Sequence, residues 1–172
     1  CLPMDIRVLR GVAVSPTLHA RFDAKGKQYT YRIYNAPQAS ALYRNLTAFM
    51  PVPLNVDAMR RALPLLLGTH DFDAFQASGG TADKTIRTLR DITLSKDGDT
   101  ITLIIRGKAF LYNMVRIIAG TLMEIGKGKL SQDCIVQALQ TGNRLLLGPT
   151  APACGLELTS IDYDIDLALI QI

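Results

Sequence analysis

The chain has 172 residues, is 48% hydrophobic and carries 19 Lys and Arg against 15 Asp and Glu, a formal net charge of +4. That length can bury one sizeable core or two small ones. Charged residues interrupt every long apolar run, so we expect no membrane-spanning segment. The three cysteines, Cys1, Cys134 and Cys154, form no CxxC pair, which favours a reducing, cytoplasmic setting over a disulfide framework.

The charge is unevenly distributed. Residues 1–50 contain seven basic and two acidic side chains, whereas residues 151–172 contain four acidic and no basic ones. A basic front half fits a polyanionic partner such as nucleic acid, and an ordinary basic cytosolic protein fits this composition equally well. His19 and His70 are far apart in the sequence with no cysteine near either, so we expect no metal site.

The first part of the chain predicts two strands. Residues 6–14 are rich in Ile and Val, and residues 27–34 alternate so that Tyr29, Tyr31 and Ile33 share one face. The first residue is not Met and no signal-peptide pattern follows it. We therefore expect that the chain lacks its beginning.

A helix is expected next. Asn55 is a suitable N-cap for a helix that extends to Leu67 and ends at Gly68. Pro64 lies inside this pattern and should kink the helix or shorten its regular part. Residues 69–75 then predict a short irregular turn anchored by two phenylalanines.

A β-hairpin follows a surface loop at residues 79–83. Residues 86–95 and 100–106 alternate in hydrophobicity, and the intervening Lys-Asp-Gly-Asp supplies the chemistry of a tight turn.

Two helices and a strand complete the chain. The apolar pattern predicts a helix over residues 109–125 that ends at Gly126, a helix capped by Ser131 that runs to Gln140, and a strand over residues 156–163. The order β-β-α-β-β-α-α-β, with hairpins, predicts one α+β domain with a mostly antiparallel sheet and helices packed on it.

Arg116 is the first candidate for a functional role, because it lies in the predicted apolar helix near Tyr112, Asn113 and Gly120. A guanidinium cannot shed its charge, so a buried one needs a carboxylate or phosphate partner. An isolated helical arginine is more often a residue at the core edge, with its stem packed and its head in water.

Tyr29 and Arg87 are further candidates. Tyr29 lies on a basic strand and could stack on a base, although a half-buried strand tyrosine is the commoner explanation. Residues 84–88 could contact phosphates from the rim of a cleft, and a solvated strand start explains them equally well. Around His70 and Asp71 no nucleophile motif is present, and Asp71 is better interpreted as bonding its own turn.

Seven segments together resemble a known family. They are LPMDI at 2–6, HARF at 19–22, YTYRIYN at 29–35, LLGTHDF at 66–72, KTIRT at 84–88, AFLYNMVR at 109–116 and GPTAP at 148–152 with Gly155 and Leu156. In this order and over residues 2–163 they resemble the C-terminal portion of the tRNA pseudouridine synthase A (TruA) family.

The resemblance implies a pseudouridine-synthase-like fold and an isomerase that converts uridine to pseudouridine in the anticodon stem and loop of tRNA. It also implies a homodimer that needs no cofactor and no metal. The target base must leave its stack before the reaction, which requires stacking partners and a basic groove.

The resemblance also implies residue roles. Arg116 matches the arginine that pairs with the catalytic aspartate, and Tyr29 matches the tyrosine that packs on the target uracil and accepts the proton from its carbon. Asn113 stands where many members have histidine and is expected to bind substrate, as is Arg87, which would contact RNA.

The family's nucleophilic aspartate lies in an Arg-Thr-Asp-x-Gly-Val-His segment that this sequence does not contain. We therefore expect residues 1–172 to be the C-terminal domain of a synthase, inactive alone because the half with the aspartate is absent. The alternatives are a non-catalytic RNA-binding module with a synthase-like fold and a structural or assembly domain.

Overall fold

A computed structural model of the protein describes residues 2–9, 11–80, 82 and 84–164. Six strands form one sheet in the order β2-β1-β5-β4-β3, and β6 pairs with β1. Apart from the parallel β1–β2 pair, all the pairs are antiparallel. The strands are β1 Gly26–Tyr34, β2 Ala48–Phe49, β3 Gly68–Asp71, β4 Ile86–Asp97, β5 Thr100–Gly107 and β6 Leu156–Asp162. The α+β class and the mostly antiparallel sheet are confirmed.

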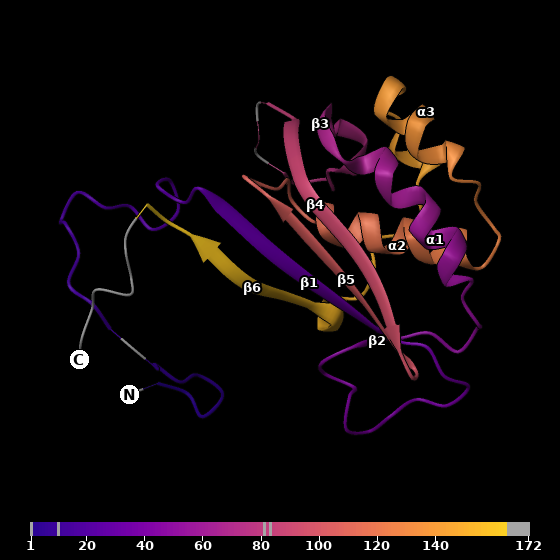
Figure 1. The fold of residues 1–172 in the computed structure, drawn as a ribbon, viewed down its shortest axis with the longest axis horizontal. Helices are drawn as coiled ribbons and strands as arrows, with labels where there is room; N and C mark the ends of the chain where they lie inside the picture. The colour runs from indigo at the N-terminus through magenta and orange to yellow at the C-terminus, as the bar shows by residue number, and fades with distance from the viewer. Residues whose placement is uncertain (1, 10, 81, 83, 165–172) are drawn as a thin grey trace.

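Three helices lie together beside the sheet, away from β6 (Figure 1). They are α1 Val56–Ala62, α2 Met114–Gly126 and α3 Asp133–Thr141. On β1 the predicted alternation is confirmed, because Tyr31 and Ile33 are fully buried in the core and Tyr29 packs against it. No helix among the described residues is long and apolar enough to cross a membrane.

The region after β2 agrees with the prediction in its cap and differs at its end. The Asn55 side chain accepts a hydrogen bond from the Ala58 backbone N–H at 3.0 Å, and Pro64 lies in a 3-10 turn that follows α1. The irregular turn predicted at residues 69–75 is partly wrong. Gly68–Asp71 forms β3, because β4 offers it a free edge with which to pair.

The hairpin of β4 and β5 is confirmed, with Gly98 at a φ of 53° in its two-residue turn. Gly79 and Gly80 lie in a loop as predicted, while positions 81 and 83 of that loop lie outside the described residues. The hairpin places the start of β4 beside the end of β5, where the loop towards α2 begins.

The start of the main helix was predicted wrongly. Helix α2 begins at Met114 and not at Ala109, because Asn113 adopts a left-handed conformation (φ 58°, ψ 10°) that an α-helix cannot contain. Helix α3 begins near the predicted Ser131, whose hydroxyl accepts a hydrogen bond from the Asp133 N–H at 3.3 Å.

The strand predicted over residues 6–14 is also wrong. Residues 6–9 and 11–14 have no regular secondary structure, and their large apolar side chains are exposed, with Leu9 at 93%. A strand needs a neighbour to satisfy its backbone groups. No described strand pairs with this segment.

A close backbone approach fixes α2 against the segment that follows α3. A methyl group at Gly120 would overlap the carbonyl oxygen of Pro149, and a Cβ at Gly148 would lie 2.7 Å from the Gly120 carbonyl oxygen. The Thr121 hydroxyl accepts from the Gly148 N–H at 3.1 Å, and the Arg116 carbonyl accepts from the Ala151 N–H at 3.1 Å. Small residues on α2 therefore let residues 148–151 lie directly on its backbone.

We predict that Gly120→Ala lowers the free energy of unfolding by at least about 2 kcal/mol, because backbone and not a flexible side chain must move to admit the methyl group. Urea denaturation measures the change. Gly11→Ala is the control, since nothing lies within 4 Å of the added carbon there. Equal stabilities of the two variants would contradict the close approach.

Candidate functional site

Arg116 lies in the first turn of α2 and is held by two hydrogen bonds. Its Nε donates to the Ala151 carbonyl at 2.7 Å, and its Nη1 donates to Asn113 Oδ1 at 3.0 Å. None of the ion pairs among the described residues involves Arg116. A guanidinium has five N–H donors, so part of this one is fixed in place while other donors are available to an anion.

Asn113 gives Arg116 its second partner and sets the start of α2. It is the only non-glycine residue with a positive φ in the described part of the chain, and asparagine tolerates that conformation better than most residues. Because an arginine can only donate, the amide atom that faces it is Oδ1. The NH₂ group of Asn113 can therefore donate to a ligand.

A small cavity of about 80 Å³ opens beside Arg116, and we call it the inner niche. Tyr29 and Phe110 form part of its wall and meet edge to face, with ring centroids 5.0 Å apart at 83°. Burial raises the pKa of Tyr29 above its ordinary value of 10.0, so its phenol is neutral near pH 7. The niche thus combines aromatic walls with one fixed guanidinium.

A larger cavity of about 450 Å³, the outer pocket, shares Tyr29, Phe110, Leu111 and Asn113 with the inner niche. Its remaining lining residues are Arg21, Gly79, Gly80, Ala82, Arg87 and Tyr112. No acidic residue lines either cavity in the described part of the chain. The two cavities therefore form one cleft with a positive lining.

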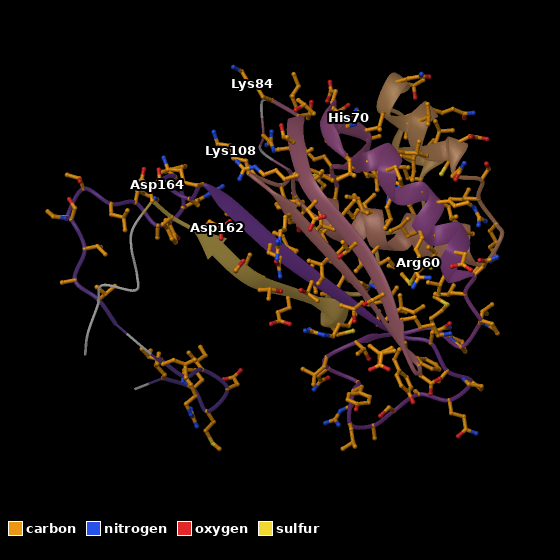
Figure 2. The ribbon with its side chains drawn as sticks, in the orientation of Figure 1. Arg60, His70, Lys84, Lys108, Asp162 and Asp164 are labelled. Carbon is orange, nitrogen blue, oxygen red and sulfur yellow. The ribbon has the colours of Figure 1, made fainter. Side chains whose placement is uncertain are left out.

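Arg87 reaches the outer pocket from β4. Its Nη1 donates to the backbone carbonyls of Lys84 at 2.8 Å and Ile86 at 2.7 Å, while its Nε is buried with no hydrogen-bond partner among the described residues. Lys84, ahead of β4, and Lys108, just after β5, lie at the same end of the sheet (Figure 2). Asp162, which pairs with Gly26 at the start of β1, lies at this end as well, so the positive charge belongs to the pocket lining and not to the whole end of the sheet.

The structure brings the four predicted site residues together. Tyr29 and Asn113 line both cavities, Arg87 lines the outer pocket and Arg116 lines the inner niche. Asn113 lies near Arg116 as predicted and accepts a hydrogen bond from it, although Asn113 precedes the helix and is not part of it.

Three lining residues were missed as individual candidates: Arg21, Phe110 and Tyr112. Each belongs to a segment that carried the family resemblance or the basic front half, but no pattern distinguished it from its neighbours. His70 and Asp71, set aside from the sequence, make only local contacts: His70 Nε2 with the Leu67 carbonyl at 2.7 Å, and Asp71 Oδ1 with the Asp73 N–H at 3.2 Å.

Comparison with known proteins gives a consistent result. A family model described as tRNA pseudouridine synthase matches residues 62–164. The tRNA pseudouridine synthase A of Acetivibrio thermocellus is 45% identical over 162 residues, which cover 94% of this chain and 66% of the relative. The protein of the same name from Halalkalibacterium halodurans is 46% identical over 155 residues, which cover 90% of this chain and 59% of the relative. The chain thus spans less than two thirds of these relatives.

We predict that Asn113→Ala destabilises the protein by about 1–2 kcal/mol, because alanine is strained at a positive φ and removes an acceptor from Arg116. Asn113→Gly relieves the backbone strain but still loses the hydrogen bond to Arg116. Its free energy of unfolding should therefore lie between those of Asn113→Ala and wild type. Chemical denaturation measures both variants. If glycine were no better than alanine, the backbone explanation would fail.

The raised pKa of Tyr29 predicts a pH dependence of stability. An unfolded tyrosine loses its proton near pH 10, while the buried one keeps it, so unfolding releases a proton above that pH. The stability present below about pH 10 should fall as pH rises through the folded pKa, at up to about 1.4 kcal/mol per pH unit for each such group. The free energy of unfolding of Tyr29→Phe, measured by urea denaturation, should fall less steeply than that of wild type between pH 9 and about 11. Parallel curves for the two proteins would contradict the raised pKa of Tyr29.

Proposed function

This chain belongs to the tRNA pseudouridine synthase A family, and we propose that it forms the uracil-side half of an active site that isomerises uridine to pseudouridine in the anticodon stem and loop of tRNA. The nucleophilic aspartate comes from a segment outside residues 1–172, because no Arg-Thr-Asp-x-Gly-Val-His sequence occurs here. Residues 1–172 act in this proposal as the C-terminal domain of the synthase.

The observation that carries the proposal is the fixed guanidinium of Arg116 without a carboxylate partner among the described residues. It lies at the start of a 13-residue helix, where the helix dipole also favours negative charge. An aspartate brought to this position would have its pKa lowered by the adjacent cation and remain ionised. Arg116 would thus keep the nucleophile charged and oriented.

The proposed reaction balances as an isomerisation. A carboxylate oxygen bonds to C1′ of the ribose while the C1′–N1 bond breaks and its electron pair stays on the uracil. The uracil turns within the niche, C5 bonds to C1′, and the carboxylate leaves. C5 then loses a proton and N1 gains one, so no oxidant or reductant is required.

Tyr29 and Asn113 hold the uracil in this scheme. The Tyr29 ring is fixed by its edge-to-face contact with Phe110 and offers an apolar surface to the base. Because burial raises the pKa of Tyr29, its hydroxyl accepts the C5 proton only if it passes its own proton to another acceptor. The Asn113 NH₂ group can donate to a uracil carbonyl.

The wider assignments rest on family membership. We propose tRNA as the partner, a homodimer for the complete synthase, and a cytoplasmic location, to which the free thiols of Cys134 and Cys154 in the described part of the chain add support. An RNA-binding module without catalysis is the alternative, favoured by the absence of any acidic residue from the described lining of both cavities.

The test is tritium release from tRNA that carries 5-tritiated uridine. We predict no release by this chain alone, together with tRNA binding that weakens steeply with salt. Fusion to the part of the Acetivibrio thermocellus relative that this chain does not span should restore release. In that fusion Arg116→Gln should lower the rate at least about 100-fold, as expected for a lost electrostatic contact.

The control is Arg61→Gln in the same fusion, since Arg61 is exposed on α1 and lines neither cavity. Release by the unfused chain would mean that an aspartate within residues 1–172 is the nucleophile. A folded fusion that binds tRNA and releases no tritium would favour the RNA-binding module.

A further inference from the structure

We propose that the outer pocket binds the RNA nucleotide adjacent to the target uridine. Arg21 and Arg87 would grip the phosphate between the two nucleotides, and Tyr112 would stack on the neighbouring base. This inference rests on the proposed function, because it assumes that the target uracil occupies the inner niche next to Arg116. It assigns a second subsite within the same cleft.

The division of the cleft is the first argument. The inner niche of about 80 Å³ contains Arg116, and the outer pocket of about 450 Å³ contains Arg21, Arg87 and Tyr112. Tyr29 and Phe110 line both cavities. A pocket several times larger than the niche, and continuous with it, has room for more of the RNA chain than the reacting base.

Charge is the second argument. Arg21, from the turn before β1, and Arg87, from β4, line one pocket that has no acidic residue in its described lining. The Nη1 of Arg87 donates to two carbonyls and its Nε is buried, so Nη2 carries the donors that are left for a ligand. Guanidinium groups suit a phosphodiester, because they keep their charge and donate to its oxygens.

The placement of Arg87 strengthens this assignment. Its Nη1 is fixed by the carbonyls of Lys84 and Ile86, so the guanidinium plane is oriented before any ligand arrives. Pre-orientation reduces the side-chain entropy lost on binding. Arg21 is exposed, and its guanidinium lies 5.7 Å from the centre of the Phe22 ring. It can therefore close on a phosphate from the solvent side.

Tyr112 is the third argument. Its side chain is 56% exposed although the residue lies between the buried Leu111 and the partly buried Asn113. Its backbone is held in place, because its carbonyl accepts from the Ala77 N–H at 3.1 Å. An exposed aromatic ring on a fixed backbone beside a basic pocket is the usual stacking platform for single-stranded nucleic acid.

One part of the outer pocket's lining, from the loop before β4, is made of small residues. Gly79 and Gly80 line the outer pocket, and Gly79 has a φ of 88°, which favours glycine. Glycines here leave space for the sugar–phosphate chain to approach the backbone.

The test measures binding of a labelled anticodon stem-loop RNA by fluorescence anisotropy over a range of salt concentrations. Arg21→Gln and Arg87→Gln should each make the slope of log K against log salt shallower, and the double variant should lower it by about 0.7–0.9, the loss of one phosphate contact. Tyr112→Ala should weaken binding about 5- to 100-fold with the slope unchanged. Arg61→Gln, the matched control, should leave the slope at the wild-type value.

A fluorescent base analogue, 2-aminopurine, locates the neighbouring nucleotide when it is placed in turn on either side of the target uridine. At one of the two positions its fluorescence should fall on binding, because it stacks on Tyr112. Tyr112→Ala should abolish that fall, and Tyr112→Phe should not. Arg87→Lys is the control that separates loss of the positive charge from a disturbed fold, because lysine keeps the charge. It should retain the slope while binding less tightly than wild type.

The outcomes separate this inference from the proposed function. A wild-type chain that binds no RNA contradicts the proposed function. A wild-type chain with a steep salt slope that is unchanged in Arg21→Gln and Arg87→Gln leaves the proposed function standing and overturns the phosphate site. Equal 2-aminopurine signals in wild type and Tyr112→Ala overturn the stacking site.

Discussion

The hydrogen bond from Arg116 Nε to the Ala151 carbonyl is the interaction on which the cleft depends. That carbonyl is in place only because residues 148–151 lie on the backbone of α2, and they can do so only because positions 120 and 148 are glycines. The Ala151 N–H returns a hydrogen bond to the Arg116 carbonyl, so the residue is fixed through its backbone as well as its side chain. Two glycines remote from the cavity thus determine where a charge lies within it.

The sheet fixes the other wall of the cleft by register. Tyr29 is paired with Ile105 on β5 and Leu158 on β6, so neighbours on both sides hold it. Phe110 comes from the loop between β5 and α2 and meets Tyr29 edge to face. A one-residue slip of β1 would turn Tyr29 to the opposite face of the sheet. The fully buried Tyr31 and Ile33 resist such a slip, since both would move into solvent.

Patterns that depend on local chemistry were sufficient to predict much of this structure. The cap of α1 at Asn55, the β4–β5 hairpin and the alternation of β1 follow from short-range rules, and the structure has all three. The grouping of Tyr29 and Arg87 with Asn113 and Arg116 came from the family resemblance, because only the last two are close in the sequence.

Most of the errors share one physical cause, which is dependence on partners distant in sequence. Residues 6–14 have strand composition, but composition supplies no neighbouring edge for pairing. Gly68–Asp71 looked irregular and became β3 because β4 had a free edge. The left-handed Asn113 is a local error: it was missed because the apolar pattern continues across it, and its side chain accepts a hydrogen bond from Arg116. Arg21 was missed as a lining residue because the turn before β1 brings it to the outer pocket, and no sequence pattern predicts that pocket.

The charge balance of the molecule also argues that the cleft is built for a ligand. Elsewhere in the described residues four basic side chains have acidic partners, among them Lys127 with Glu124 at 2.7 Å and Lys25 with Asp164 at 3.1 Å. The cleft collects Arg21, Arg87 and Arg116 with no acid in its described lining, and mutual repulsion of like charges destabilises such a site. Three arginines that share a described lining without an acid gain nothing in stability from the arrangement. Anions supplied from outside these residues, a carboxylate at Arg116 and a phosphate at Arg21 and Arg87, relieve that repulsion at both ends of the cleft.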